Sequence, residues 1–463
     1  MDFTSTASLR AINFDNMKST LITNVSLVNE GMVTLSDVLI KGEFISATGI
    51  VGSISADNDA EIIDGTGLHL FPGLIDDQVH FREPGLTHKG DLYTESRAAV
   101  AGGITSYMEM PNTSPPAVTI DLLEEKYKRA SEVSLANYSF FMGTTNHNLD
   151  ELLKVDPRSI CGVKIFMGSS TGDMLVEDHD ALDKIFSEVK TLIALHCEDD
   201  NLIKENAAVY RKEFGEDVPV TMHHLIRSAQ ACYNSSSFAV SLAKKHNTRL
   251  HILHISTARE LALFRNDIPL REKRITAEAC VHHLWFTNED YEKRGMFIKW
   301  NPAIKTKEDR DAIRAAVNDG RIDVIATDHA PHTIEEKEQS YFKAPAGGPL
   351  VQHSLVALLE LYHNGIFSLE KIAEKTAHNV ADMFAIDRRG YVREGYFADL
   401  VLVDLADPWT VNVENILYKC GWSPFEGCAF RSRVQKTFVN GNLVYDNGNV
   451  IETSNGKRLT FNR

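Results

Sequence analysis

The stretch FPGLIDDQVHFR, residues 71–82, joins a Pro-Gly turn, a short apolar run and a polar end. A Pro-Gly pair interrupts regular structure, and the apolar run after it is typical of a buried β-strand. Polar side chains at the carboxyl end of such a strand are typical of α/β enzyme sites. His80 offers a metal-binding imidazole. Arg82, on the same face of an extended strand, offers a planar guanidinium for a carboxylate.

Strand-like runs alternate with amphipathic helical stretches through the middle of the chain, for example at 120–133 and 306–320. This alternation predicts βα units and a parallel sheet. Eight apolar runs are interpreted as strands: Leu74–His80, Gly103–Met110, Tyr138–Thr145, Gly162–Met167, Leu192–Cys197, Arg249–Ile255, Ile275–Val281 and Asp323–Thr327. Eight such units predict an α/β fold with a TIM-like (β/α)₈ barrel over residues 71–387.

The two ends of the chain differ from the middle. Residues 19–70 contain short alternating runs broken by Gly, Asn and Asp, and a similar pattern returns over residues 388–455, with Asn-Gly hairpin signals. One small β-sandwich domain built from both chain ends is therefore expected. Residues 1–18 have no clear period and are interpreted as a flexible extension.

Composition excludes several classes of function. The chain has 463 residues, 43% of them hydrophobic and 24% charged, as expected for a globular enzyme, and a net charge of -16. This acidic balance argues against nucleic acid or an anionic membrane as the partner, although one local Arg can still bind a small anionic substrate. We expect no signal peptide and no membrane span. Six scattered cysteines predict reduced thiols in a cytoplasmic protein.

Unusual polar residues lie at or just past the ends of the predicted strands, where a barrel would bring them to one mouth. They are His80, Asn112, Lys164, His196, His254, His282, His283 and Asp328. A single histidine at a strand end is more often structural than a ligand. Several imidazoles together with the carboxylate of Asp328 favour a Zn²⁺ site. His251 does not fall at the mouth and is interpreted as structural.

Lys164 and Asp328 each have two interpretations. Apolar neighbours of Lys164 would lower its pKa and leave a nucleophilic amine that can add CO₂, giving an anionic carbamate able to bridge two metals. The alternative is a lysine that reaches solvent. Asp328 is interpreted as a metal ligand that acts as the catalytic base and then acid, with a helix N-cap as its alternative.

Seven motifs in order resemble those of the cyclic amidohydrolases, specifically the dihydroorotases of the long-chain type. They are FPGLIDDQVHFREPG, YMEMPNT, VKIFMGSSTG, LHCED, LHIST, KWNPAIK and ATDHAPH. The resemblance implies a barrel with a β-sandwich and a centre of one or two zinc ions bridged by carboxylated lysine. It also implies reversible hydrolysis of dihydroorotate to N-carbamoyl-aspartate in de novo pyrimidine biosynthesis.

The resemblance also assigns roles by position. The implied metal ligands are His80, Lys164, His196, His254 and Asp328. The implied clamp on the substrate carboxylate is Arg82, Asn112 and His332, and the implied contacts to the pyrimidine ring are Asn301 and the backbone at Ala346 and Gly347. Turn chemistry before proline is an equally good explanation of Asn301, and an alternative for Asn112. Glu198, His282, His283 and His329 are expected to orient the ligands or to be structural.

Two positions depart from the family pattern: Gln78 stands where most relatives have histidine, and the segment APAGGPLVQHS, 344–354, is unusual. Gln78 is therefore a doubtful ligand. The alternatives are a hydantoinase-like or allantoinase-like amidohydrolase, and a catalytically weak scaffold for aspartate carbamoyltransferase. A homodimer is expected. Residues 168–175 are interpreted either as a mobile lid or as an ordinary βα connection.

Overall fold

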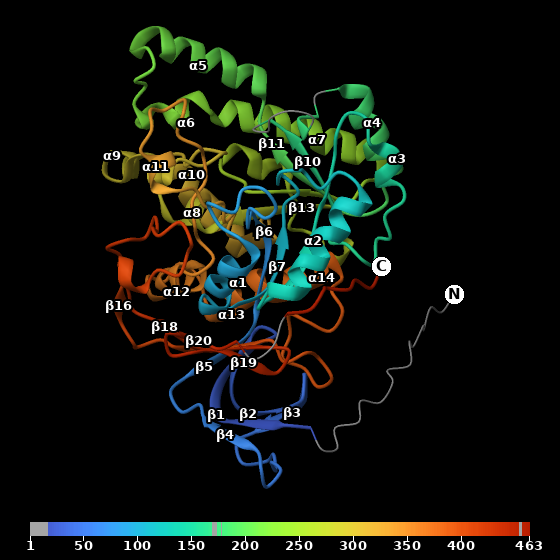
Figure 1. Ribbon diagram of the computed structural model, residues 1–463, viewed down its shortest axis with the longest axis vertical. Coiled ribbons are helices and arrows are strands. Elements are labelled where there is room, and N and C mark those ends of the chain that lie inside the picture. The colour runs from blue at the N-terminus through green and yellow to red at the C-terminus, as the bar shows by residue number, and fades with distance from the viewer. Residues whose placement is uncertain (1–16, 169–173, 177, 453–455) are drawn as a thin grey trace.

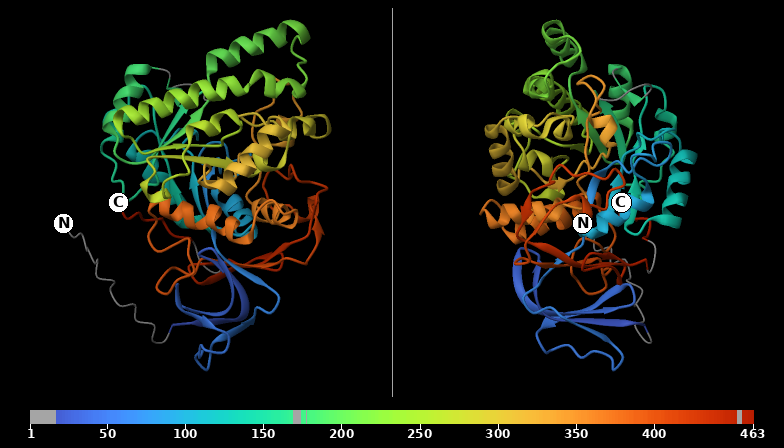
Figure 2. Two further views of the ribbon diagram at one scale, coloured as in Figure 1. Left: turned by 180° about the vertical axis from the view of Figure 1, so that it is seen from behind. Right: turned by 60° about the vertical axis from the view of Figure 1, so that its left-hand side comes forward.

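The computed structural model describes residues 17–168, 174–176, 178–452 and 456–463. A helix-covered body of parallel strands occupies most of the molecule, and a sheet-rich region lies at one end (Figure 1). The C-terminal strands run between the N-terminal strands and the helical body, which both further views also show (Figure 2). Within the part of the chain described, no helix has the length and apolar character needed to span a membrane.

Every predicted strand of the middle region contains an observed strand. These are β6 (Leu74–Val79), β7 (Ile104–Glu109), β8 (Asn137–Phe140), β9 (Met142–Gly143), β10 (Val163–Met167), β11 (Ile193–Cys197), β12 (Leu250–Ile252), β13 (Ile275–Cys280) and β14 (Val324–Ala326). The run predicted at 138–145 is divided into β8 and β9. Neighbouring strands pair in parallel, so their carboxyl ends lie at the same edge.

The ladder of these strands is not closed, which differs from the predicted barrel. Hydrogen bonds define a three-stranded sheet, β6-β7-β8, and a six-stranded sheet, β14-β13-β12-β11-β10-β9. Between β6 and β14 a side chain replaces the ladder: Asp76 accepts hydrogen bonds from the backbone N–H of Thr327 at 3.2 Å and from its hydroxyl at 2.6 Å. One bridge between Val79 and His329 follows.

Helices cover the outer face of these strands, and most begin at a residue that caps the free N–H groups of the first turn. Asp91 and Thr306 form capping boxes, while Thr119, Asp199 and Ser228 accept single bonds. The longer helices are α1 (Leu92–Ala101), α2 (Ile120–Val133), α4 (His179–Glu188), α5 (Asp200–Phe214), α7 (Ala229–His246), α10 (Lys307–Asp319) and α12 (Ser354–His363).

Strands from both chain ends form one continuous nine-stranded sheet. It contains β1 (Ser19–Asn29), β2 (Met32–Lys41), β3 (Phe44–Ile50), β4 (Glu61–Asp64), β5 (His69–Pro72), β15 (Leu400–Asp404), β18 (Arg433–Val439), β19 (Asn442–Asp446) and β20 (Asn449–Val450). The predicted β domain from both chain ends is therefore present as one hydrogen-bonded sheet, and its packing into a sandwich stays a prediction. The long strand β1 pairs with β2, β4 and β5, and an irregularity between Ile22 and Val25 interrupts its register with β2.

A buried polar network joins this sheet to the helical body. Asp399, just before β15, pairs with Arg389 and accepts bonds from the Asn440 N–H at 2.8 Å and from Asn137 Nδ2 at 3.2 Å. Asn440 in turn donates to Asn137 Oδ1 at 2.8 Å. All four residues are buried, so the network fixes the two parts relative to each other.

The last described residues, 456–463, lie beneath the parallel strands. Leu459 donates its N–H to Tyr138 O at 2.9 Å, and Arg463 donates to Cys161 O at 2.8 Å. This segment therefore covers the amino-terminal ends of β8 and β10, opposite the edge where the polar strand ends collect. The sequence pattern did not predict this contact.

Candidate active site

A cavity of about 170 Å³ lies at the carboxyl ends of the parallel strands. Every residue that the sequence analysis assigned as a metal ligand or substrate contact lines it: Gln78, His80, Arg82, Asn112, Lys164, His196, His254, Asn301, Asp328, His332, Ala346 and Gly347. Phe166, Trp300 and Ala330 also line the cavity and were not predicted. Trp300 lies in the KWNPAIK motif, so a signal for it was present in the sequence.

Strand ends bring these side chains together. Lys164 and His196 lie within β10 and β11, while His80, His254 and Asp328 come just after β6, β12 and β14. Because all these strands are parallel, residues far apart in the chain converge on one edge. The segment 168–175 follows β10, but residues 169–173 lie outside the described part of the chain.

His80 and Asp328 form one half of the candidate metal centre. His80 Nε2 lies 3.2 Å from Asp328 Oδ1, and His80 Nδ1 lies 2.7 Å from Asn112 Oδ1. Since the amide oxygen can only accept, Nδ1 carries the hydrogen and Nε2 directs its lone pair at the carboxylate. Burial lowers the pKa of His80, which disfavours a second proton on this ring. A cation between the two groups would satisfy both.

His196 and His254 form the other half. His196 Nδ1 lies 2.9 Å from His254 Nε2, and His196 Nε2 lies 2.9 Å from Glu198 Oε2. Burial lowers the pKa of both imidazoles, so both rings are neutral near pH 7. Burial acts to raise the pKa of Glu198, but Arg227 and His196 outweigh it and hold that pKa below its ordinary value. Glu198 thus orients His196 and leaves Nδ1 as a ligand atom.

Lys164 lies beside both halves and is buried, with 1% of its surface exposed. Its ammonium nitrogen has no hydrogen-bond partner among the described residues and lies 4.5 Å from the centre of the Phe166 ring. Burial lowers the pKa of Lys164 to about 7, despite the opposing charge of Asp328. A large fraction of the side chain is therefore a neutral, nucleophilic amine near neutral pH.

Gln78 faces Asp328 through its amide nitrogen. Gln78 Nε2 donates to Asp328 Oδ1 at 3.1 Å, and Cys280 Sγ lies 3.7 Å from Gln78 Oε1. An amide nitrogen is not a metal ligand, so in this orientation Gln78 holds the carboxylate of Asp328 rather than an ion.

Arg82 supplies a buried positive charge on another wall of the cavity. It donates from Nε to Pro331 O at 3.1 Å, and its Nη2 lies 3.0 Å from His332 Nε2. No carboxylate of the described residues lies within ion-pair distance of this guanidinium, and burial lowers its pKa to about 10. A bound anion is therefore the natural partner for its planar donors.

The predicted ring contacts are partly engaged by the protein itself. Asn301 Oδ1 is buried without a hydrogen-bond partner among the described residues, so it is available to a ligand. Gly347 donates its N–H to Lys299 O and accepts from Lys337 Nζ, both at 2.8 Å, while Ala346 O lies 3.0 Å from His332 Nε2. A ring contact through the Gly347 N–H would require its bond to Lys299 O to break, whereas the Gly347 carbonyl oxygen keeps a second lone pair for a ligand.

Three site residues have a backbone conformation that is rare outside glycine. Arg82, His254 and Asp328 have φ values of 73°, 39° and 51°. Such conformations cost about 1 kcal/mol or more each and collect at functional sites. Each of these residues follows a strand end, so the unusual backbone turns its side chain into the cavity.

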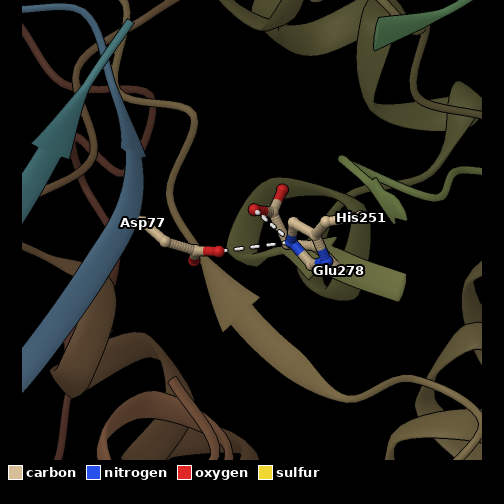
Figure 3. Close-up of side chains that lie close together, drawn as sticks. All are labelled: Asp77, His251 and Glu278. Carbon is tan, nitrogen blue, oxygen red and sulfur yellow. Dashed lines mark ion pairs between the residues drawn. The ribbon is translucent and has the colours of Figure 1, made fainter. Parts of the chain in front are cut away.

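A second group of ligand-type side chains lies within the strand layer (Figure 3). Asp77 on β6, His251 on β12 and Glu278 on β13 have ligand atoms within 4.8 Å of one another. They do not line the cavity described above. His251 was interpreted as structural because it does not reach the mouth. That placement is correct, but the sequence did not reveal the two carboxylates beside it.

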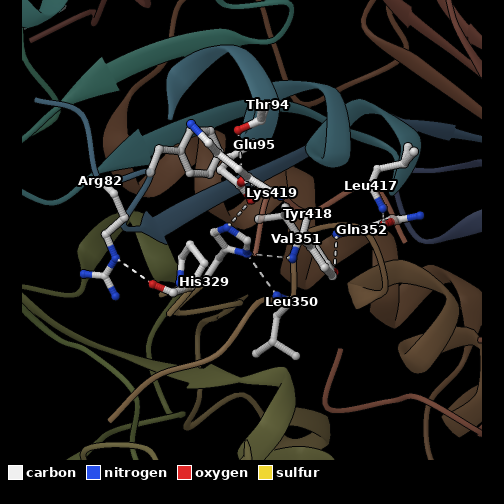
Figure 4. Close-up of polar contacts among 12 residues, drawn as sticks. Arg82, Thr94, Glu95, His329, Leu350, Val351, Gln352, Leu417, Tyr418 and Lys419 are labelled. Atoms are coloured by element: carbon white, nitrogen blue, oxygen red, sulfur yellow. Dashed lines mark hydrogen bonds and ion pairs between the residues drawn. The ribbon is translucent and has the colours of Figure 1, made fainter. Parts of the chain in front are cut away.

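His329 fixes the segment that carries Asp328 (Figure 4). Its Nδ1 accepts from the Leu350 N–H at 2.9 Å, so Nε2 carries the hydrogen and donates to Glu95 Oε2 at 2.9 Å. Both of its nitrogens are engaged, which makes His329 a support and not a ligand. His282 and His283 lie behind the cavity wall. The ring of His282 stacks on that of Trp300, with 4.5 Å between the ring centres.

Residues 69–444 match the model of the amidohydrolase family. The chain belongs to this family. It is 33% identical to a dihydroorotase of Halobacterium salinarum, over 91% of this chain and 96% of that protein, and 31% identical to an allantoinase of Desulfitobacterium hafniense, over 94% and 98%. An L-hydantoinase (dihydropyrimidinase) from Arthrobacter aurescens has a similar structure, with a TM-score of 0.89, 26% identity and coverage of 96% of this chain and 100% of that one. The chain is thus a hydrolase that acts on cyclic amides.

Proposed function

We propose that this protein is a dihydroorotase, which hydrolyses dihydroorotate reversibly to N-carbamoyl-aspartate in pyrimidine biosynthesis. Arg82 carries the proposal. It is a buried guanidinium with no carboxylate in ion-pair distance among the described residues, and it faces the cavity beside His332 and Asn112. Dihydroorotate has a ring carboxylate that a planar guanidinium can bind through two parallel hydrogen bonds.

The donor set fits a metal centre of one or two zinc ions. His196 Nδ1 and His254 Nε2 converge, the His80 Nε2 lone pair faces Asp328, and Lys164 Nζ is buried without a partner among the described residues. These residues would hold the metal, with Lys164 carboxylated as the bridge. Bound zinc would polarise the amide carbonyl and lower the pKa of a water molecule.

The protein's own residues have separate tasks in this proposal. Asp328 takes the proton of the attacking water and returns it to the ring nitrogen that leaves. Gln78 and the backbone turn at Asp328 hold this carboxylate in position. Arg82 and Asn112 orient the substrate carboxylate, and Asn301 offers the ring N–H groups an amide oxygen that has no partner among the described residues.

Hydantoinase or allantoinase activity is the second candidate, favoured by the relatives with those names. Hydantoin and allantoin are neutral rings without a carboxylate, and would leave the Arg82 charge buried without a partner. A scaffold role for aspartate carbamoyltransferase is less consistent with a cavity in which every expected ligand position except Gln78 has a ligand-type residue.

Steady-state assays with dihydroorotate, hydantoin and allantoin on zinc-loaded protein test the assignment. We expect turnover of dihydroorotate to dominate. In Arg82→Lys the charge remains but the planar fork is lost, so kcat/KM for dihydroorotate should fall at least about tenfold, about 1.4 kcal/mol. Any activity on hydantoin should change little and serves as the control. Equal losses for both substrates would remove Arg82 from the carboxylate clamp.

We infer that the two parallel sheets are arcs of one (β/α)₈ barrel over residues 71–387, beside a β domain of residues 19–70 and 388–455. Two contacts support closure. The chain passes directly from β8 to β9, and the Asp76–Thr327 bonds with the His80 N–H to His329 O bond of 2.7 Å join β6 to the segment after β14.

A further inference from the structure

We propose that Asp77, His251 and Glu278 form a second metal site, inside the strand layer and separate from the cavity, for a divalent ion such as Zn²⁺ or Mn²⁺ (Figure 3). His251 Nε2 lies 3.2 Å from Asp77 Oδ2 and 3.7 Å from Glu278 Oε2. Ligand atoms about 2.0–2.2 Å from a tetrahedral ion are themselves roughly 3.3–3.6 Å apart, so the two distances from His251 are close to those of a metal site.

The protonation of His251 suits a ligand. Its Nδ1 lies 2.9 Å from Thr276 Oγ1, and that hydroxyl donates its own hydrogen to Leu250 O at 3.3 Å. Thr276 must therefore accept from Nδ1–H, which leaves Nε2 as the nitrogen that faces both carboxylates. Against burial, which lowers it, Asp77 and Glu278 raise the pKa of His251, so in the absence of a metal Nε2 carries a hydrogen toward them. A bound divalent ion would take the place of that proton.

Burial makes a positive charge beside the carboxylates necessary. Asp77, His251 and Glu278 are fully buried, and neither oxygen of Asp77 nor Glu278 Oε2 has a hydrogen-bond partner among the described residues. His251 offers these two buried carboxylates at most one positive charge, whereas one divalent ion neutralises both.

A proton on His251 could neutralise the carboxylates in place of a metal ion, but the geometry favours the metal. A hydrogen on His251 Nε2 points at one acceptor, and the nearer is Asp77 Oδ2. Glu278 Oε2 would then still lack a donor. A metal ion contacts all three groups at once, and a mixed nitrogen and oxygen set suits Zn²⁺ and Mn²⁺.

Contacts connect this interior site to the catalytic cavity. Glu278 Oε1 accepts from the His254 N–H at 2.9 Å and lies 3.3 Å from Cys280 Sγ. Cys280 also lies beside Gln78, which donates to Asp328. An ion at Glu278 would thus fix the strand that positions His254 and would stabilise the floor of the cavity.

Anomalous diffraction from crystals of the zinc-loaded or manganese-loaded holoenzyme, measured at the metal edge, tests the proposal directly. We expect a peak between Asp77, His251 and Glu278, in addition to density in the cavity. Peaks in the cavity alone would overturn the proposal and leave protons as the neutralising charge. This measurement uses the unaltered protein, so it does not depend on the folding of any variant.

Metal content by plasma mass spectrometry gives an independent test. Asp77→Asn and Glu278→Gln should each lose about one ion per chain, while His196→Asn, altered only in the cavity, should keep the interior ion. Glu260→Gln is the matched control, because Glu260 is a buried carboxylate bonded to Ser236 at 2.6 Å and lies outside both sites. If His196→Asn loses all metal, or Asp77→Asn loses none, the interior site does not exist.

Discussion

Lys164 is a buried side chain whose protonation links stability to pH. Its pKa is lowered from 10.5 to about 7, so folding disfavours the ammonium form. That cost is fully present below pH 7 and disappears as the pH rises toward 10.5. In metal-free, bicarbonate-free protein, Lys164→Met should therefore raise the midpoint of thermal unfolding more at pH 6 than at pH 9.

Lys126→Met is the matched control for this prediction. Lys126 is equally buried but is paired with Glu109 at 2.9 Å, so its removal leaves a buried carboxylate unpaired. Thermal unfolding of this variant should occur at a lower temperature at both pH values. A gain in Lys164→Met that is independent of pH would contradict the assignment of a lowered pKa.

Gln78 makes the two halves of the cavity unequal. An amide is a weaker zinc ligand than an imidazole, and here its nitrogen faces Asp328. Metal held by His80, Lys164 and Asp328 should therefore bind more weakly than metal held by His196, His254 and Lys164. Gln78→His should raise the occupancy of the weaker position, as measured by titration with a chelating indicator. Two equally tight positions in the unaltered protein would contradict this account.

At the scale of elements, the strand ends could be predicted because each is a local pattern. An apolar run followed by His80, His254 or Asp328 is visible within ten residues of sequence. The interruption between β6 and β14 could not be predicted, since it depends on Asp76 reaching Thr327, 251 positions away. The two carboxylates beside His251 could not be predicted for the same reason. The sequence shows which residue types end each strand, but not which distant strands become neighbours.

His329 connects helix α1 to the segment after β14 through its hydrogen bond to Glu95. His329→Leu removes the bonds to Glu95 and Leu350 and leaves a buried carboxylate without its imidazole partner. We expect the free energy of unfolding to fall by about 3 kcal/mol, measured by urea denaturation. Amide exchange in residues 328–332 should accelerate.

His363→Leu is a suitable comparison, since His363 is a partly exposed histidine bonded to Ser432 at 2.8 Å. The free energy of unfolding of His363→Leu should differ from that of the unaltered protein by no more than about 0.5 kcal/mol. If both variants lose the same stability, the His329 contacts have no special role in holding the segment of Asp328.

At the scale of the whole molecule, the Asp399 network should make the sheet and the helical body unfold together. Asp399→Ala leaves the Arg389 guanidinium buried without its carboxylate, which should cost about 3–5 kcal/mol. In the unaltered protein, circular dichroism and tryptophan fluorescence should show the same single transition on urea denaturation, because the two parts unfold together. Separate transitions there would mean that the network does not couple the two parts. Asp404→Ala, at the far end of the same strand, is the control with little expected effect.

Strand β5 lies between β1 and β15 in the continuous sheet, although β15 comes only after residues 73–399. During synthesis on the ribosome, the edge of β5 therefore waits unpaired while the whole catalytic region emerges and folds. An exposed strand edge is a template for pairing with other chains. Slowed or prematurely terminated translation should accordingly yield aggregated nascent chains. Moving residues 388–463 ahead of residue 17 by circular permutation should relieve the delay.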